Sequence, residues 1–431
     1  MGTDTIFALA SGAGRAAIAV FRLSGPATAG VLRTVCGRLP RPRVASLRAL
    51  RDPDGVLLDR GIVVWMPGPH SYTGEDAAEL HVHGGPAVLD GVAEALLRLG
   101  AEPAEPGAFT RRALLNGRMD VLEAEAVADL VAAETSAQRA QALRQLEGEL
   151  GALYRGWTDR LTQVMARQEA LIDFPDEDLP PEAEARLLRE VETVRDEIAA
   201  HLADSRRGER LRDGLVFAVA GPPNVGKSTL VNALAGREVA ITSPTPGTTR
   251  DALETRIVLA GVPVTLVDTA GIREAVDPVE AEGVRRARDR AAQADLVIRV
   301  FAPGIPDTGA EPGHAREIPV ANKADLGGVL GTHALPVSAV TGIGLAALRA
   351  RLEAAARNLT AQAGPPALTR ARHRAALTEA AERLSGALET EWPELRAEDL
   401  RLALRAIGRV TGAVDVEQVL DALFAEFCIG K

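Results

Sequence analysis

The spacing of apolar residues changes along this chain. Short apolar runs separated by turns fill the first segment, where Ala16–Phe21 and Gly61–Trp65 predict strands and Ala87–Leu99 predicts an amphipathic helix. From Val121 onward, apolar residues recur every three or four positions, which is the period of a helix. We therefore expect a mixed α/β domain over residues 1–120, followed by a helical region.

The helical pattern occurs twice, in stretches far apart in the sequence. It predicts one long helix over Val121–Leu146 and another over Arg186–Leu202, and it returns from Arg370 to Phe427 with a break at Pro393. Chain termini of a domain often lie close together, so one domain can be inserted into another. The two stretches therefore predict one discontinuous helical domain.

A strand-like region separates the two helical stretches. Leu215–Ala220 is continuously apolar, as expected of a parallel strand that is buried on both faces. Leu253–Leu259 and Val262–Val267 predict a pair of strands joined by a Gly-containing turn. The predicted fold class is multidomain, α/β plus all-α, with helical pieces at residues 121–212 and 363–431 and an inserted α/β domain at residues 213–362.

Composition and charge narrow the class of protein. The chain is 46% hydrophobic and 25% charged, which is typical of a globular protein, and its net charge is −10. That balance excludes a protein coated in positive charge, so any contact with RNA should be local. Cys36 and Cys428 cannot form a disulfide framework, and Cys36 is expected in a core. With no leader-like start after Met1 and no apolar run long enough for a bilayer, we expect a cytoplasmic protein without membrane contact.

The stretch after the first buried strand carries the strongest chemical signal. Gly221–Ser228 reads G-P-P-N-V-G-K-S and fits the phosphate-binding pattern G-x-x-x-x-G-K-[ST] at every fixed position. In that pattern the backbone wraps a di- or triphosphate, Lys227 meets the β/γ-oxygens and Ser228 ligates Mg²⁺. Of 49 basic residues only Lys227, Lys323 and Lys431 are lysines, which suggests that a compact ammonium is needed at position 227.

Two further motifs follow at strand ends. Asp268–Gly271 (D-T-A-G) provides an acid for Mg²⁺ and a backbone N–H for a γ-phosphate. Asn322–Asp325 (N-K-A-D) places a carboxylate where it can accept from N1–H and the amino group of guanine, a donor pair that adenine lacks. Ser338 and Ala339 complete the base pocket. The order of elements matches a Ras-like GTPase with GTP as its nucleotide.

The polar loop between these motifs fits a switch that becomes ordered on the γ-phosphate. It spans Gly236–Asp251, and Thr249 offers a hydroxyl to Mg²⁺. Position 272 is Ile272, so no glutamine is present there to position water, and no arginine finger can be assigned. Residues 302–316 form a short Pro- and Gly-rich span where Ras-like domains usually carry a helix, and we expect that edge to be reduced.

Two features of the chain have plain structural interpretations. His81 and His83 fall on one face of a predicted strand, but no third ligand stands at a usable spacing, so hydrogen-bonded histidines are favoured over a metal pair. Ile172–Asp178 is an acidic, proline-broken loop. A solvated connection is favoured there over a cation site.

The motifs together resemble one family. G-P-P-N-V-G-K-S, G-T-T-R-D, D-T-A-G-I-R-E and N-K-A-D, set in a helical domain and followed by a terminal C-I-G-K, are similar to the MnmE (TrmE) family of tRNA modification GTPases. S-Y-T-G-E-D, an H-G-G turn and I-D-F-P-D-E extend the similarity over nearly the whole chain. The resemblance implies a homodimer formed through the N-terminal domain, with G domains that pair when GTP and K⁺ bind.

For the G domain, the resemblance implies K⁺ ligands and a catalytic glutamate. K⁺ would replace the missing arginine finger, with Asn224, Ser243, Thr245 and Thr248 as its ligands. Glu280 would orient water, and Glu280 and Lys227 would be the catalytic residues; in an unfamiliar sequence Glu280 would be a solvated glutamate at a helix start. The residues expected to bind GTP are Asn224, Val225, Gly226, Lys227, Ser228, Thr229, Ser243, Thr248, Thr249, Asp268, Thr269, Ala270, Gly271, Asn322, Lys323, Asp325, Ser338 and Ala339.

For the N-terminal domain, the resemblance implies that it binds a tetrahydrofolate derivative, 5-formyl or 5,10-methylene, as one-carbon donor. Arg22, Glu79 and Arg118 fall at the family's folate positions, and Lys431 would reach in from the C-terminus. Arg118 departs from the lysine associated with its position, so its contact should differ in geometry. Cys428 matches the family's C-terminal cysteine, a possible functional thiol.

We consider two main hypotheses for the function. The first is a K⁺-activated GTPase that forms a heterotetramer with an FAD protein of the MnmG/GidA kind and installs an aminomethyl or carboxymethylaminomethyl group at C5 of wobble uridine in tRNA. The second is a GTP-switched protein of ribosome assembly or RNA binding. Such a protein should carry an RNA-binding module such as a KH domain, and the chain shows no such module at its ends. Asp325 disfavours a third version, an ATP-using motor or kinase.

Overall fold

A computed structural model shows two compact units, each built from stretches that are distant in sequence. The first comprises Met1–Ala128, Gln145–Gln163 and Arg401–Lys431, and the second comprises Asp129–Arg144 and Val164–Leu400. The predicted domain borders stay predictions. The residues that the structure describes are 4–12, 14–173, 182–204, 206–236, 254–268, 292–305, 316–327, 333–361 and 366–414, with Leu420, Leu423, Phe424, Phe427 and Gly430.

A six-stranded sheet forms the centre of the first unit, in the order β3-β4-β5-β2-β1-β6. Neighbours are antiparallel except β1 and β6, which are parallel. The predicted strands and helix of this segment are confirmed. Their bounds are β1 Thr5–Leu9, β2 Ala16–Ser24, β3 Ser46–Arg51, β4 Leu57–Met66, β5 Ala77–Gly84, β6 Ala101–Pro103, α1 Thr28–Cys36 and α2 Pro86–Arg98.

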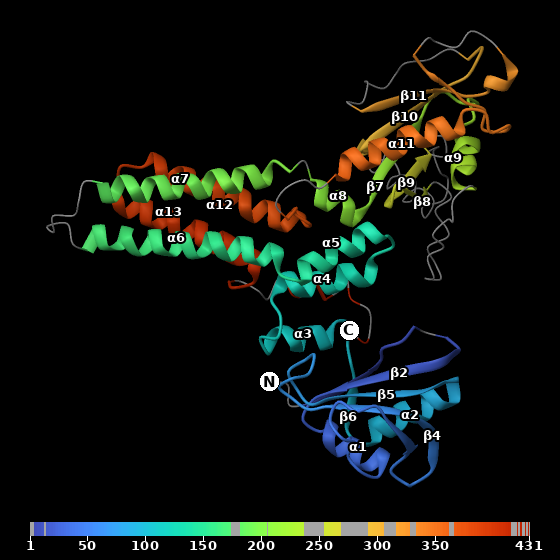
Figure 1. Cartoon of the computed structure of the whole chain (residues 1–431), viewed down its shortest axis with the longest axis vertical. Coiled ribbons are helices and arrows are strands. Elements are labelled where there is room, and N and C mark those ends of the chain that lie inside the picture. Colours follow the sequence, from blue (N-terminus) through green and yellow to red (C-terminus); the bar gives the residue numbers. More distant parts are fainter. Residues whose placement is uncertain are drawn as a thin grey trace, which may run out of the picture. The chain divides into compact units, whose positions relative to one another are not determined.

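The two faces of this sheet differ in what covers them. Helices α1 and α2 lie on one face (Figure 1), where Leu32 and Leu96 pack with Leu23 and Leu80 of the strands in one buried core. Side chains of a strand alternate between faces. Neighbouring residues of β1 therefore point the other way, and Ile6 packs there with buried side chains of the segment from β6 to α3 (Ala108–Leu115).

Two helices begin where the sequence offers a reciprocal N-terminal cap. The predicted single helix over Val121–Leu146 is wrong, because Thr135 and Gln138 form a capping box that starts a new helix: Gln138 N–H donates to Thr135 Oγ1, and Gln138 Oε1 accepts from Thr135 N–H. Asp120 and Glu123 form the same device one helix earlier. The helical elements are α4 Val121–Ala132, α5 Ser136–Leu146, α6 Glu149–Asp173, α7 Glu182–Leu202, α8 Arg207–Asp213, α12 Ala371–Glu389 and α13 Pro393–Thr411.

Helices of the second predicted helical stretch pack against helices of the first, as expected if an α/β domain is inserted between them. Helices α7 and α12 lie side by side (Figure 1). Gln168 Nε2 of α6 donates to the carbonyl of Pro393 at 3.1 Å, and Arg396 of α13 pairs with Glu184 of α7 at 2.7 Å. Among the helices of the described residues, none has the length and apolar character of a bilayer span.

The inserted domain is a six-stranded sheet in the order β12-β11-β10-β7-β9-β8, parallel except for β8. This order confirms the Ras-like prediction. The predicted reduction of the 302–316 edge concerns residues that lie largely outside the described part. The bounds are β7 Leu215–Ala220, α9 Lys227–Ala235, β8 Glu254–Leu259, β9 Val262–Asp268, β10 Leu296–Phe301, β11 Glu317–Ala321, the 3₁₀ turn η2 Ala324–Leu326, β12 Leu335–Pro336 and α11 Leu345–Thr360.

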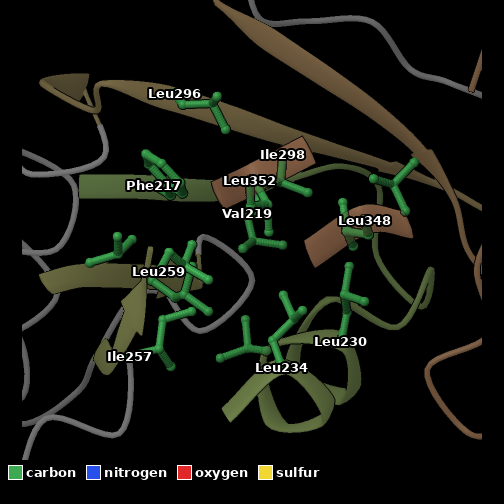
Figure 2. Packing of buried hydrophobic residues seen from close by; sticks show 14 of the residues in the cluster. Phe217, Val219, Leu230, Leu234, Ile257, Leu259, Leu296, Ile298, Leu348 and Leu352 are labelled. Carbon is green, nitrogen blue, oxygen red and sulfur yellow. The ribbon is translucent and has the colours of Figure 1, made fainter. Parts of the chain in front are cut away.

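One apolar core holds the phosphate loop's flanking elements in place. Figure 2 shows Phe217 and Val219 of β7, Leu230 of α9 and Leu352 of α11 in one cluster, and all four are fully buried. Each such side chain stabilises the fold by about 1.5–3 kcal/mol relative to exposure. The strand and helix on either side of the loop are therefore rigid supports. Arg299 in the middle of β10 stays half-buried and lies 3.7 Å from Glu317.

Candidate nucleotide and N-terminal sites

Two glycines let the loop after β7 adopt its shape. Gly221 and Gly226 have φ angles of 147° and 92°, in a region that side chains rarely adopt. A Cβ at Gly221 would lie 2.2 Å from the carbonyl oxygen of Val300, and one at Gly226 would lie 2.5 Å from Nδ2 of Asn322. The loop is therefore packed too tightly for any other residue at its two ends.

Lys227 is folded onto the loop that it serves. Its Nζ donates to the carbonyl oxygens of Gly221 at 2.6 Å and Pro222 at 2.9 Å, and the residue is 5% exposed. Burial lowers the pKa of Lys227, and the carboxylate of Asp268 opposes that shift. Two carbonyls thus hold an ammonium group inside the loop, where phosphate oxygens would be stronger partners.

Ser228 and Asp268 come together at the ends of α9 and β9. Ser228 Oγ donates to Asp268 Oδ2, although the residues are 40 positions apart. Asp268 is buried, while Ser228 and Thr229 are exposed at the start of α9. A hydroxyl beside a carboxylate is a suitable donor set for Mg²⁺, which prefers oxygen ligands. The residues present therefore fit the predicted metal.

The N-K-A-D segment is tied to the phosphate loop through its first two side chains. Asn322 donates from Nδ2 to the carbonyl of Val225 at 2.9 Å and accepts from Ala339 N–H at 3.1 Å. Lys323 Nζ donates to the carbonyl of Asn224 at 2.8 Å. Asn322 thus joins the phosphate loop to the base pocket.

The carboxylate predicted to bind the base lies at the surface. Asp325 is exposed at η2, whereas Ser338 is fully buried and its Oγ accepts from Thr341 N–H at 3.1 Å. The buried Ser338 hydroxyl therefore binds within its own loop, and Asp325 stays the predicted group for the base. The predicted residues Ser243, Thr245, Thr248, Thr249, Thr269, Ala270, Gly271 and Glu280 lie outside the described residues.

A second polar site lies in the N-terminal domain, around Arg22. The guanidinium pairs with Glu79 across neighbouring strands, at 3.0 Å between Nη2 and Oε1, and it donates to the carbonyl of Gly430 at 3.3 Å. It also lies over the rings of Tyr72 and Phe109, 5.8 and 5.9 Å from their centroids. The structure therefore brings two predicted folate residues into contact and sets the end of the chain beside them.

Of the remaining predicted folate residues, Arg118 is described by the structure and Lys431 is not. Arg118 is exposed, and its stem would lie 3.2 Å from a Cβ added at Gly74, in the same loop as Tyr72. Lys431 and Cys428 lie outside the described residues. Arg118 therefore borders the loop beside Arg22 without a described contact to it.

Sequence reasoning missed the aromatic part of this site. Tyr72 and Phe109 were given no role, although they flank the guanidinium. Tyr72 OH lies 2.9 Å from Thr110 Oγ1, and burial raises the pKa of the phenol. The only signal was an aromatic residue within S-Y-T-G-E-D, a polar loop that otherwise needs none.

Arg112 fixes the loop that carries Tyr72. Its Nη1 donates to Glu75 Oε2 at 2.9 Å, and its Nη2 donates to Asp4 Oδ2 at 3.1 Å. Ser24 also donates to Glu75 Oε2, at 2.8 Å, and shares a hydrogen bond with Thr73. Charge-assisted hydrogen bonds of this kind are worth about 1.5–3 kcal/mol each, so the loop has a defined position.

Each of the two histidines lies beside a carboxylate. His81 Nε2 lies 3.2 Å from Glu79 Oε2, and His83 Nδ1 lies 2.8 Å from Asp59 Oδ1. Within the described residues, no group of three acidic, histidine or cysteine side chains could hold a metal ion. Cys36 packs against the core of the first unit, and burial raises the pKa of its thiol to about 11.

Comparison with known proteins gives consistent matches along the chain. The family described as MnmE helical domain matches residues 121–428, and the one described as GTP-binding protein TrmE N-terminus matches residues 5–118. A tRNA modification GTPase MnmE of Gluconacetobacter diazotrophicus is 58% identical and covers 99% of this chain and 98% of its own length. The protein of that name from Granulibacter bethesdensis is 55% identical and covers 100% of both. A solved structure of Era from Aquifex aeolicus aligns at 25% identity over 41% of this chain and 69% of its own, with a TM-score of 0.25, which supports no inference.

Proposed function

This chain belongs to the MnmE family of tRNA modification GTPases, and from that premise we propose that it hydrolyses GTP to GDP and phosphate as part of tRNA modification. The observation that carries the proposal is the junction made by Asn322, which ties the phosphate loop at Val225 to the base pocket at Ala339. Three separate motifs are thereby held as one site.

The residues of the loop supply binding and charge. Lys227 would exchange the carbonyls of Gly221 and Pro222 for β/γ-oxygens, since a charged acceptor makes the stronger hydrogen bond. Ser228, with Asp268 behind it and Thr249 from the switch, would hold Mg²⁺. When bound, that ion neutralises charge that develops on the phosphates. Asp325 would select guanine by accepting from N1–H and the amino group.

We further propose that K⁺ activates hydrolysis, with Asn224, Ser243, Thr245 and Thr248 as ligands and Glu280 as the residue that orients water. The support is Ile272, which cannot position a nucleophile, together with the family membership. Hydrolysis should be roughly tenfold or more faster in KCl than in NaCl at equal ionic strength, since a cation replaces an arginine finger. Equal rates would contradict K⁺ activation.

A second measurement isolates Glu280. In Glu280→Ala, GTP affinity should persist while turnover falls by roughly 10² or more, because a water-orienting group acts on the chemical step. Glu282→Ala, two residues away, is the matched control and should turn over normally. Unchanged turnover in Glu280→Ala would support the alternative interpretation, in which Glu280 is a solvated residue without a catalytic role.

The tRNA chemistry completes the proposal. Arg22, Glu79, Arg118 and Lys431 would hold a tetrahydrofolate derivative, since cations suit the folate carboxylates and a carboxylate suits the donors of the pterin ring. A homodimer, together with an FAD protein of the MnmG/GidA kind, would then install an aminomethyl or carboxymethylaminomethyl group at C5 of wobble uridine, in the cytoplasm.

Nucleoside mass spectrometry of tRNA tests this assignment. Cells lacking the protein should lose a C5-substituted wobble uridine, and the gene restored with Arg22→Ala should fail to recover it. A full set of modified nucleosides with a defect in ribosome assembly would instead support the alternative GTP-switched assembly factor.

A further inference from the structure

The N-terminal part of the chain contains an unusually long stretch without acidic residues. Residues 5–51 contain no Asp or Glu, although the chain has 59 acidic residues in 431, so roughly six would be expected there from composition alone. The same stretch carries eight arginines. The chain as a whole has a net charge of −10, whereas this stretch is positively charged.

The fold gathers most of these arginines at one edge of the N-terminal sheet. Helix α1, the connection after it and β3 follow one another, and β3 is the edge strand. Helix α1 packs against β3, and Arg48 on β3 is close enough to Cys36 at the end of α1 for its charge to oppose the rise in the thiol pKa that burial causes. We call this region the α1–β3 edge; its exposed arginines are Arg33, Arg38, Arg41, Arg43 and Arg51.

Hydrogen bonds fix the connection between α1 and β3, which carries Arg38, Arg41 and Arg43. Pro42 bridges to Trp65 of β4, and Arg43 N–H donates to the carbonyl of Trp65 at 2.7 Å. The guanidinium of Arg43 donates to the carbonyl of His70. Arg38 and Arg41 therefore project from a defined backbone, which reduces the entropy lost when they bind a ligand.

Within the described residues, these five arginines form no ion pair. Two acidic side chains of the domain pair with other arginines, Glu79 with Arg22 and Asp54 with Arg98. Helix α7 differs, since Arg195 there lies 2.7 Å from Asp196 and 3.5 Å from Glu192. The positive charge of the α1–β3 edge is thus unbalanced by the chain itself, so it attracts an external polyanion.

We propose that the α1–β3 edge binds the phosphate backbone of tRNA. This inference rests on the proposed function, which requires a tRNA to be held while its wobble base reacts. The chemistry favours phosphates over bases, because residues 28–51 contain no aromatic side chain on which a base could stack. Arginine forks match phosphate oxygens in pairs. The contact should therefore be insensitive to sequence and strongly dependent on salt.

The test uses the full-length protein and a labelled tRNA transcript, with affinity measured by anisotropy from 50 to 300 mM KCl. The variant R38Q/R41Q should bind at least about fivefold more weakly near 150 mM salt, and its slope of log K against log salt should be shallower by about 1 to 2. The matched control is R186Q/R189Q, which removes two exposed arginines from α7, where acidic residues are interspersed. It should bind as the unmodified protein does.

Two outcomes would overturn the proposal. One is equal affinity and equal slope for R38Q/R41Q and the control. The other is intact tRNA binding in R38Q/R41Q together with lost binding of the flavoprotein partner, which would assign the edge to a protein surface. GTP hydrolysis should be unchanged in both variants. Either outcome leaves the proposed function standing, since that function fails only if cells without the protein keep their modified wobble uridine.

Discussion

The nucleotide site and the Arg22 site are both polar, but they are assembled differently. In the phosphate loop, Gly221, Gly226, Lys227 and Ser228 are almost contiguous, and backbone groups would supply much of the binding. Around Arg22, each partner comes from elsewhere: Glu79 from β5, Tyr72 from a loop, Phe109 from α3 and Gly430 from the chain end.

The difference predicts how each site fails. A local loop between a buried strand and a helix depends on one or two side chains, and losing one removes a large share of its function. A site gathered from five places distributes its binding energy, so each single loss should be smaller. Substitutions in the two sites can therefore be ranked before they are made.

The largest effect is expected at Lys227. Lys227→Ala should reduce GTP turnover by about 10²–10³, because it removes a charge aimed at the transferring phosphate. Lys227→Arg should not restore it, since the residue is 5% exposed and its compact ammonium lies between two carbonyls, where the larger, planar guanidinium has a different geometry. Turnover is measured by phosphate release under saturating GTP.

The matched control for Lys227 is Arg256→Gln, which removes a positive charge from the exposed edge strand β8 of the same domain. It should turn over GTP normally. Full activity in Lys227→Arg would show that any cation suffices at position 227 and would weaken the argument from the scarcity of lysine.

Much of the nucleotide site was predictable from sequence because its signals are local. An apolar run, two glycines and a lysine specify strand, turn and helix with no need to know the rest of the fold. The same local logic erred over Val121–Leu146, where apolar periodicity continues across a capping box at Thr135 that interrupts the helix.

The Arg22 site could not be derived in that way. Arg22 and Glu79 are 57 positions apart and face each other only because β2 and β5 pair in one particular register. Nothing in the sequence around either residue distinguishes it from the other charged residues of the chain, and only the family resemblance indicated them. Tyr72 and Phe109 were not indicated by the resemblance either, since an aromatic partner for a cation is recognisable only in three dimensions.

An intermediate effect is expected at Arg22. Arg22→Ala should weaken binding of a tetrahydrofolate derivative by roughly 10- to 100-fold, because it removes a charge-assisted hydrogen bond donor and leaves Glu79 without its cation. GTP turnover should stay unchanged. Isothermal titration calorimetry with 5-formyltetrahydrofolate measures the affinity, and Arg111→Ala, an exposed arginine on α3, is the control. Unchanged affinity in Arg22→Ala would exclude this cluster as the folate site.

The smallest effect is expected at Tyr72, and it distinguishes the two ways in which that residue could act. Tyr72→Leu removes both the ring beneath Arg22 and the hydroxyl beside Thr110, whereas Tyr72→Phe removes only the hydroxyl. A cation–π contact at a partly exposed site is worth about 0.5–1 kcal/mol, so Tyr72→Leu should cost roughly two- to fivefold in folate affinity. Tyr72→Phe should bind nearly normally. If Tyr72→Phe instead loses as much as Tyr72→Leu, the hydroxyl and not the ring holds Arg22 in position, and the aromatic contact contributes nothing to the site.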